Sequence, residues 1–475
     1  MKIALIGAGS AVFSKTLMND ILSTPALSGC EIALMSPTES KLRKIESFAK
    51  RMVKDNGKTA AVSATTDRRE AIRSADFVIV TINPGGLAAY RHDYEIPMKY
   101  GVDQCIGDTL GPGGVFRGAR TIPVLAGIAK DMEELAKPGA LMLQYANPMA
   151  ANCLALGKVS RVPFVGLCHG VQTTLDLIAR YCGVPKEEIA FTCGGINHMD
   201  WFLTLTHNGN DMYPRLREVF EKPEYYKNEK VRGEMFRQFG YFMTESTGHL
   251  SEYLPYFRKN RKALDVYCDE PAFGGESGAY YKFAIALAEK YKDRDPIEFD
   301  STELSPRSVE YCSYIMEAVV TGRPFRFMGN VRNDGFIGNL PDGCCVEVPV
   351  IADSTGIHPT RIGSLPAQCA ALCQTNINVQ TLAAQAALDG DTEALVHAAA
   401  LDPLTAAVLT LAEIRAMCSD MLEAERPWLP QFSGKHIRPV PAISIPADVR
   451  PVDVPLDPAL AIAHRFGTLA EQKTK

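Results

Sequence analysis

The chain has 475 residues, of which 46% are hydrophobic and 22% charged, and its formal net charge at pH 7 is −5. A chain of this length can bury a large core in two or three domains. The weak acidity and the lack of a dense run of Lys and Arg argue against a nucleic-acid-binding surface. No apolar run approaches the roughly 20 residues that cross a bilayer.

The chain opens with an apolar run, residues 2–7, that leads directly into a glycine-containing loop. The run is too short for a secretion signal, so we interpret it as a buried strand. In the loop Gly7-Ala8-Gly9-Ser10, the glycines supply the tight turn and close backbone approach that a pyrophosphate needs at a helix N-terminus. Val12 replaces the third glycine of the usual fingerprint. The loop favours a dinucleotide cofactor, with a simple strand-to-helix turn as the alternative.

Apolar strand-like runs alternate with amphipathic helices over the first 170 residues. The expected strands cover residues 2–7, 31–35, 77–82, 141–145 and 163–167. This alternation predicts an α/β fold with a doubly wound, Rossmann-like parallel sheet, whose ligands lie beyond the carboxyl ends of the strands. We place this dinucleotide-binding domain at residues 1–194.

The second strand ends near Ser36, where dinucleotide-binding folds usually carry an acid that holds the ribose hydroxyls. A neutral residue there leaves NAD and NADP as alternatives. The candidate cofactor-binding residues come from the first loop and from later strand ends, and they are Gly7, Gly9, Ser10, Ala11, Val12, Phe13, Asn83 and Asn147.

Polar residues follow the later strands at the same edge of the sheet. Cys168 and His169 come directly after the strand at 163–167, and His198 opens a similar segment one helix and one strand later. Taken singly, Cys168 is more often a buried core residue and His198 a histidine satisfied by its neighbours. Placed together over one crevice they suit a catalytic metal, because a structural zinc site closes with four protein ligands.

Two further segments contain candidate acids and bases. Asp103 and Asp108 lie in a glycine-rich loop, which we expect to be flexible and able to close over a pocket, with a solvated surface loop as the alternative. Tyr241 has the polar Glu245 and His249 nearby, and ordinary packing is its alternative role.

Beyond residue 194 the pattern changes to mixed helices and strands, with long Ala- and Leu-rich helices over 366–422. We predict an α+β domain at 195–432 that contributes substrate, metal and oligomer contacts, and a proline-rich C-terminal tail at 433–475. The long helices favour a homodimer or homotetramer. Thirteen cysteines lie scattered along the chain, so free thiols and a cytoplasmic location are expected.

Several of these segments together resemble the NAD- and metal-dependent glycosidases of glycoside hydrolase family four, and within it the melibiase-type alpha-galactosidases. The matching motifs span the chain to about Leu429, and they are Ile6-Gly-Ala-Gly-Ser10, Gly107-Asp-Thr-Leu-Gly-Pro-Gly-Gly114, Asn147-Pro-Met149, Gly166-Leu-Cys-His169, Gly195-Ile-Asn-His-Met199, Gly240-Tyr-Phe242, Gly329-Asn-Val-Arg-Asn-Asp-Gly335, Gly343-Cys-Cys-Val-Glu-Val348 and Gln374-Thr-Asn-Ile-Asn-Val-Gln380.

The resemblance implies an unusual hydrolysis, outside the two-carboxylate scheme of most glycosidases. Bound NAD takes a hydride from C3 of the sugar, a base removes the C2 proton that the new ketone acidifies, and the aglycone leaves by elimination. Water then adds, and the reduced cofactor returns the hydride. A divalent metal, Mn, held by Cys168 and His198 would bind the 2- and 3-oxygens of the sugar.

The same resemblance implies roles for individual residues. Tyr241 matches the family's tyrosine base. His169, which stands where some alpha-specific relatives carry an aspartate, and Asp108 are the two candidates for the acid. The residues expected to contact substrate are Asn147, His169, Gly170 and Asn197.

Gly170 separates the substrate alternatives. Melibiases carry serine at this position, and glycine there resembles the alpha-glucuronidase subgroup. An alpha-glucuronide or another C6-modified hexoside is therefore the alternative to the alpha-galactoside that the rest of the chain favours. From other classes, an NAD-dependent 2-hydroxyacid dehydrogenase would leave Cys168 and His198 without a role, and a non-catalytic dinucleotide sensor would need no metal.

Overall fold

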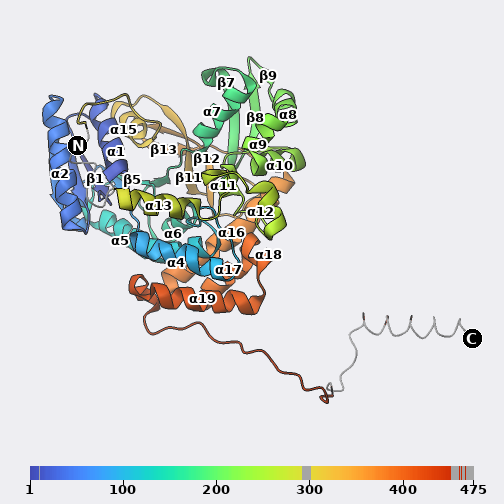
Figure 1. Ribbon diagram of the computed structural model, residues 1–475. Helices are drawn as coiled ribbons and strands as arrows, with labels where there is room; N and C mark the ends of the chain where they lie inside the picture. The colour runs from blue at the N-terminus through green and yellow to red at the C-terminus, as the bar shows by residue number, and fades with distance from the viewer. Residues whose placement is uncertain (10, 291–300, 451–458, 460–461, 463–465, 467–475) are drawn as a thin grey trace, which may run out of the picture. The chain divides into compact units, whose positions relative to one another are not determined.

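Six short strands in the first half of the chain form the parallel part of one large sheet (Figure 1). In the computed structural model they run in the order β3-β2-β1-β4-β5-β6, which is the order of doubly wound dinucleotide-binding folds. Their bounds are β1 (Lys2–Ile6), β2 (Glu31–Met35), β3 (Ala61–Thr65), β4 (Phe77–Val80), β5 (Leu141–Gln144) and β6 (Phe164–Gly166). The predicted fold class is confirmed.

Five of these strands coincide with the apolar runs in the sequence, and β3 was not predicted. Its residues, Ala61–Thr65, are small and partly exposed at the edge of the sheet. The segment therefore lacks the continuous apolar run that marks a buried parallel strand.

Amphipathic helices connect the parallel strands. In α2, Leu42, Ile45, Phe48 and Met52 are buried at helical spacing, so one side of the helix packs on the sheet. Helix α7 ends at Gly183, whose φ of +60° is the left-handed conformation expected of a C-terminal glycine. The helices of this half are α1 (Ala11–Ser23), α2 (Glu39–Asp55), α3 (Arg68–Ile72), α4 (Gly86–Lys99), α5 (Gly111–Leu135), α6 (Met149–Val159) and α7 (Gly170–Cys182).

The second half adds antiparallel strands to the same sheet. Asn330 pairs with Gly166 and joins β11 to β6, and Glu347 pairs with Gly195 and joins β12 to β7. One sheet therefore crosses the predicted boundary at 194/195, and the predicted domain limits stay predictions. The added strands are β7 (Ile189–Ile196), β8 (Met199–His207), β9 (Asn210–Asp211), β10 (Phe242–Met243), β11 (Phe325–Arg332), β12 (Cys345–Asp353) and β13 (Gly356–Pro359).

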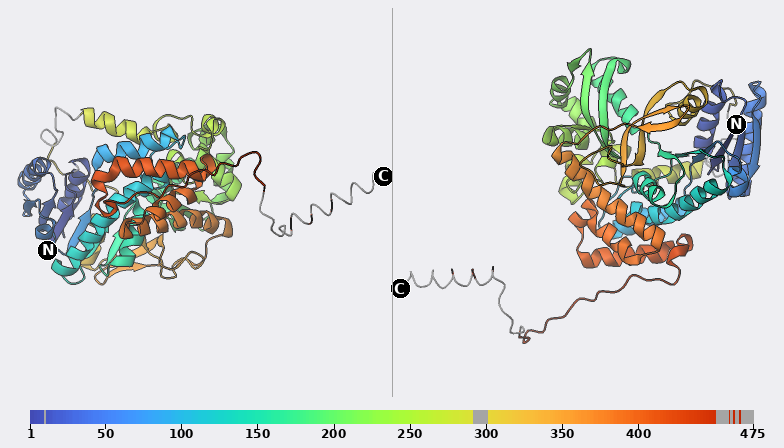
Figure 2. Two further views of the ribbon diagram at one scale, coloured as in Figure 1. Left: turned by 90° about the horizontal axis from the view of Figure 1, so that it is seen from below. Right: turned by 180° about the vertical axis from the view of Figure 1, so that it is seen from behind.

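The long Ala- and Leu-rich helices α16, α17 and α19 pack together and against α4 and α5 (Figure 2). The α-helices of the second half are α8 (Tyr213–Phe220), α9 (Pro223–Asn228), α10 (Lys230–Phe239), α11 (Thr247–Leu250), α12 (Arg261–Tyr267), α13 (Ala279–Lys290), α15 (Cys312–Thr321), α16 (Ala367–Asp389), α17 (Thr392–Leu401), α18 (Pro403–Val408) and α19 (Leu411–Glu425). Short 3₁₀ turns are η1 (Lys186–Glu188), η2 (Ala272–Gly274), η3 (Arg426–Trp428) and η4 (Pro430–Phe432).

The structure describes residues 1–9, 11–290, 301–450, 459, 462 and 466, without the side chains of Ala11 and Val12. The chain divides into two units, Met1–Arg438 and Pro439–Lys475. In the second unit, residues 439–450 form no helix or strand. Within the described ranges, no helix combines the length and apolarity needed to cross a membrane.

Candidate active site

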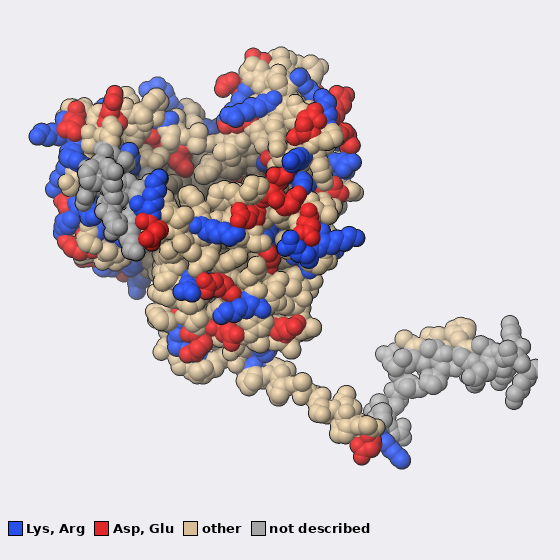
Figure 3. All heavy atoms as spheres, viewed as in Figure 1, with Lys and Arg blue, Asp and Glu red and all other residues tan. Residues whose placement is uncertain are grey.

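A cavity of about 620 Å³ lies beyond the carboxyl ends of β5 and β6. The surface is hollowed between the lobe that carries β1 to β5 and the lobe of β7 and β8 (Figure 3). Both halves of the chain contribute to the cavity wall. Its polar lining includes Asp108, Asn147, Cys168, His169, His198, Arg232, Glu245, His249 and Glu310.

Seven of the predicted site residues line this cavity. They arrive there because β5 and β6 end side by side and release their polar residues at the same edge, as in other doubly wound sheets. The predicted site residues that line the cavity are Phe13, Asp108, Asn147, Cys168, His169, Gly170 and His198.

Other predicted residues lie outside the lining. Tyr241 is half-buried and packs edge-on against Tyr213, with 6.0 Å between ring centroids. Asn197 is buried, and its amide donates to Glu347 Oε2 at 3.1 Å. Asn83 follows β4 without reaching the cavity wall. Ser10 lies outside the described residues, as do the side chains of Ala11 and Val12.

The first glycine loop has the shape that close backbone approach requires. Gly7 has a φ of +100°, and a Cβ atom there would lie 2.6 Å from the carbonyl oxygen of Thr81. A Cβ atom on Gly9 would lie 2.8 Å from Ser36 Oγ. A side chain at Gly7 or Gly9 would therefore clash with Thr81 or Ser36, so this tight strand-to-helix turn needs glycine, as do the turns at which dinucleotide-binding folds hold a pyrophosphate.

A compact polar cluster forms the floor of the cavity. Ligand atoms of His198, Glu245 and His249 all lie within 4.8 Å of one another. Glu245 Oε2 is 3.8 Å from His198 Nδ1 and 3.7 Å from His249 Nδ1. The Tyr253 hydroxyl lies behind the cluster, 3.0 Å from His198 Nδ1 and 3.3 Å from His249 Nε2, and it orients both rings.

Burial and mutual charge set the protonation of this cluster. Burial lowers the pKa of His198 to about 4 against the opposing effect of Glu245, so its ring is neutral at pH 7. Burial would lower the pKa of His249, but Glu245 raises it to about 9. Burial would raise the pKa of Glu245, yet His198 and His249 hold it below its ordinary value. The cluster therefore offers a neutral imidazole and a carboxylate, which are ligands for a divalent metal.

Cys168 lies in the same wall, and the Gly170 N–H donates to its sulfur at 3.4 Å. Burial, together with the carboxylates of Glu347 and Glu245, raises the pKa of the Cys168 thiol well above its ordinary value. A thiolate would therefore need a neighbouring cation. Cys168 and His198 share one cavity as predicted, but the ligand atoms that all lie within 4.8 Å of one another are those of His198, Glu245 and His249, and Cys168 is outside that group.

The loop that contains Asp103 and Asp108 is not the flexible lid that the glycine-rich sequence suggested. Asp103 and Asp108 are each only 6% exposed. The backbone N–H groups of Ile106 and Gly107 donate to the Glu252 carboxylate, and Arg258 forms an ion pair with Asp103. Buried charged partners therefore hold the loop in place.

Asp108 faces the cavity as an ionised carboxylate. Asn147 Nδ2 donates to Asp108 Oδ2 at 3.0 Å, and Arg117 Nη1 lies 3.4 Å from the same oxygen. Burial would raise the pKa of Asp108, but Arg117 and His249 outweigh burial and lower it. Asp108 is therefore an acceptor of hydrogen bonds rather than a proton donor at neutral pH.

His169 stands at the mouth of the cavity with a carboxylate beside it. Its Nδ1 lies 3.3 Å from Glu310 Oε1. The Glu310 contact raises the pKa of His169, which favours a protonated ring. Ser308, two residues before Glu310, is anchored on α1, where its N–H donates to Asp20 at 2.9 Å.

Sequence reasoning missed several of these partners. Glu245 and His249 were noted only as polar neighbours of Tyr241; Glu245 lies just before the short helix α11 and His249 within it. Tyr253 continues the same spacing. Glu310 has no local signal, because its partner His169 comes from a distant strand end.

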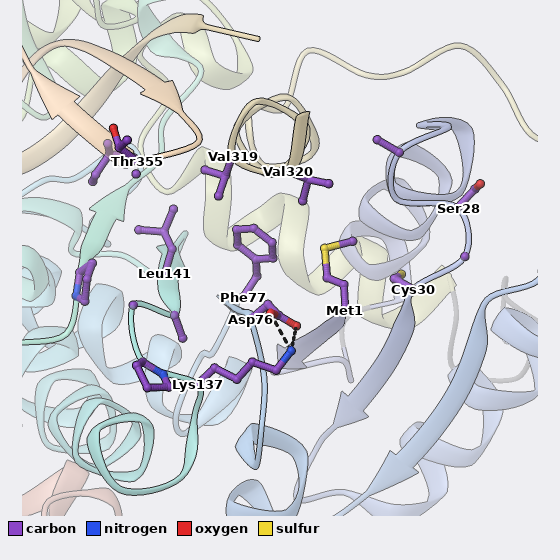
Figure 4. A pocket seen from close by; sticks show the side chains of 18 of the residues that line it. Met1, Ser28, Cys30, Asp76, Phe77, Lys137, Leu141, Val319, Val320 and Thr355 are labelled. Carbon is purple, nitrogen blue, oxygen red and sulfur yellow. Dashed lines mark hydrogen bonds and ion pairs between the residues drawn. The ribbon is translucent and has the colours of Figure 1, made fainter. Parts of the chain in front are cut away.

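A second hollow lies at the opposite, amino ends of the parallel strands (Figure 4). Its volume is about 980 Å³, and Phe77, Leu141 and Val320 are among the apolar side chains in its wall. Lys137 Nζ donates to both oxygens of Asp76, at 2.8 and 2.9 Å. Among the described residues, the group able to hold a metal lies in the other cavity, so size alone does not mark the active site.

Models of known protein families match most of the chain. The model of the family 4 glycosyl hydrolases matches residues 2–184, and the model of their C-terminal domain matches residues 193–405. The chain belongs to family 4 of the glycosyl hydrolases. The resemblance predicted from the sequence motifs is thus confirmed, and the dehydrogenase alternative is not favoured.

Two curated members of this glycosyl hydrolase family align over most of their length. An alpha-galactosidase of Rhizobium meliloti (strain 1021) is 42% identical over 439 residues, covering 91% of this chain and 90% of that protein. An alpha-galactosidase of Bacillus subtilis (strain 168) is 39% identical, covering 91% and 99%.

Solved structures of two other glycosidases share the fold. A 6-phospho-alpha-glucosidase from gut microorganisms, in complex with NAD and glucose-6-phosphate, has a TM-score of 0.75 at 21% identity and covers 90% of this chain and 99% of that one. A 6-phospho-beta-glucosidase of Thermotoga maritima, with manganese, NAD+ and glucose-6-phosphate, has a TM-score of 0.74 at 20% identity and the same coverage.

Proposed function

We propose that this family 4 glycosyl hydrolase cleaves alpha-galactosides and uses NAD and a divalent metal, Mn, to do so. The observation that carries the proposal is the assembly of Cys168, His169 and His198 in one cavity beside the glycine loop. The relatives named alpha-galactosidase, at 42% and 39% identity, support the sugar.

The glycine loop and strand ends would hold the cofactor. Gly7 and Gly9 leave space for the pyrophosphate, and Phe13 and Asn147 reach the cavity from the same side. When bound, NAD supplies a hydride acceptor that returns the hydride at the end of the cycle. The neutral Ser36 beside Gly9 places no acid at the ribose, so NADP binding is part of the test.

Cys168 and His198 would hold the metal, with Glu245 and His249 within reach of the same ion. A bound divalent metal supplies Lewis-acid stabilisation of charge on the sugar oxygens. The neutral His198 ring has a lone pair available, and Tyr253 keeps that ring in position.

His169 is the residue we assign as the acid that protonates the leaving group. The Glu310 contact raises the pKa of His169, which favours a protonated ring, whereas Arg117 lowers the pKa of Asp108, which is ionised at neutral pH. Asp108, together with Asn147, is then placed to accept hydrogen bonds from sugar hydroxyls.

For the base that removes the C2 proton, the resemblance and the geometry favour different residues. The resemblance implies Tyr241, which packs against Tyr213 outside the lining, whereas Glu245 is an ionised carboxylate in the cavity wall. A Tyr241→Phe enzyme with full activity would remove Tyr241 from the mechanism. A large loss of kcat with unchanged KM would support it as the base.

The proposal is tested with aryl alpha-galactoside, alpha-glucoside and both alpha-uronides, in the presence of Mn²⁺, a reductant, and NAD or NADP. We expect alpha-galactoside hydrolysis that needs both cofactors and releases no net NADH. Substrate deuterated at C2 or C3 should react more slowly. Failure to cleave any alpha-glycoside, or stoichiometric NADH release, would contradict the proposal.

We further propose a cytoplasmic homodimer or homotetramer. All thirteen cysteines are free thiols, which suits a reducing compartment. Light scattering of the purified protein measures the oligomeric state, and a monomer at micromolar concentration would contradict this part of the proposal.

A further inference from the structure

One cationic side chain lines the cavity away from the metal cluster. Arg232, on α10, is only 4% exposed and lines the same wall as Thr173, Thr174 and Gly170 at the start of α7. A buried guanidinium in a sugar-binding cavity is the usual partner of a carboxylate or phosphate on the substrate. The state of Arg232 therefore bears directly on which hexosides can enter.

The guanidinium of Arg232 is already engaged by the protein. Its Nε donates to Glu229 Oε2 at 2.9 Å, and its Nη2 lies 2.8 Å from the same oxygen. Its Nη1 donates to Thr174 Oγ1 at 3.0 Å. Thr247 Oγ1 also donates to Glu229 Oε2, at 3.1 Å, so the carboxylate is fixed in place. Arg232 and Glu229 therefore form a buried neutral pair rather than a free cation.

The other positive groups of the cavity are paired as well. His169 lies beside Glu310, and His249 lies beside Glu245. An anionic substituent on the sugar would lose its hydration without gaining an unpaired arginine or lysine, because Arg232 is the one such side chain among the described lining residues. A neutral hexoside faces no such penalty.

We propose that the Arg232–Glu229 pair makes this enzyme select uncharged hexosides and reject uronides and phosphorylated hexosides, with Glu229 as the specificity-determining residue. This inference rests on the proposed glycosidase function. The Arg232–Glu229 pair narrows the choice between a galactoside and a uronide that Gly170 left open. The space beside Gly170 has no unpaired arginine that could bind a C6 carboxylate.

The decisive variant is Glu229→Gln, which keeps the size and an acceptor oxygen for Arg232 and Thr247 but removes the negative charge. We expect the ratio of kcat/KM for aryl alpha-galacturonide to that for aryl alpha-galactoside to rise about tenfold to a hundredfold, the range of one charge-assisted hydrogen bond. Adding Arg232→Gln to Glu229→Gln should abolish the gain.

The matched control is Glu221→Gln. This change breaks the exposed pair in which Arg237 Nε donates to Glu221 at 2.9 Å, and neither residue lines the cavity. Its substrate ratio should equal that of the wild type. An unchanged ratio in a folded Glu229→Gln enzyme would overturn the proposal.

A measurement on the wild-type holoenzyme keeps the test independent of folding and of turnover. Calorimetric titration with galactose and with galacturonate, in the presence of Mn²⁺ and NAD, should show galacturonate binding at least about tenfold more weakly. Equal or tighter galacturonate binding would overturn the selection. If the wild type binds galactose but cleaves no alpha-glycoside, the proposed function fails while the charge selection stands.

Discussion

At the amino ends of the parallel strands the groove is bounded by Phe77, Leu141 and the Lys137–Asp76 ion pair, whereas the cavity at the carboxyl ends is bounded by a thiol, three histidines and three carboxylates. The amino-edge groove is the larger, at about 980 Å³ against about 620 Å³. The two cavities differ in the chemistry of their lining residues rather than in their volume. Polar residues that follow the carboxyl ends of neighbouring parallel strands converge in the carboxyl-edge cavity.

The largest loss of activity is expected from a cysteine variant at the carboxyl ends of the strands. A cysteine variant at the amino ends serves as its control. Cys168→Ser should lower kcat/KM by about a thousandfold or more, equal to about 4 kcal/mol of transition-state stabilisation, because it removes a proposed metal ligand. Steady-state kinetics and the metal content of the purified protein measure this.

The matched change at the amino edge is Cys30→Ser. Cys30 lines the groove, and burial raises its pKa to about 11, so it is an unreactive core thiol. The variant should keep wild-type kcat/KM. Equal losses in both variants would remove the functional distinction between the two ends.

A smaller loss is expected from Tyr253→Phe, which removes the hydroxyl lying 3.0 Å from His198 and 3.3 Å from His249. Removing an orienting partner behind metal ligands typically costs about 10- to 100-fold in activity or metal affinity. Manganese binding followed by electron paramagnetic resonance should weaken together with kcat. Unchanged metal affinity and activity would show that the two rings need no such support.

The Glu310→Gln variant should change the pH profile of activity. Glu310 raises the pKa of His169, so His169 keeps its proton as pH rises, and activity is lost only as pH passes through that raised pKa. In Glu310→Gln the alkaline limb of kcat/KM should move to lower pH, with about a tenfold loss at pH 8. Aryl glycosides with good leaving groups should be affected least. An unmoved alkaline limb would contradict the role of His169 as the acid.

The smallest effect is expected at the amino edge. Lys137→Ala breaks the ion pair with Asp76, but the Lys137 side chain is 49% exposed, so unfolding by urea should change by at most about 1 kcal/mol. Its kcat and KM should be unchanged. A selective loss of activity would indicate that the amino-edge groove takes part in function.

Local sequence alone predicted five of the six parallel strands and the glycine loop, because buried strands are continuous apolar runs and Gly7 occupies a backbone conformation with φ of +100°. The placement of Cys168 and His169 in the cavity followed from the rule on strand ends. The edge strand β3, which has no such run, was missed.

Only the tertiary structure decided which charges are paired and which loops are fixed. Glu310 reaches His169, and Glu252 holds the loop of Asp108, through contacts between segments far apart in the chain. Arg232 pairs with Glu229, three residues before it, but its other partner, Thr174, lies on a distant helix. The sequence by itself determined the family and the parallel sheet, and it marked candidate metal-binding residues. The pKa shifts of these residues depended on burial and on partners brought in by the fold, which no local pattern records.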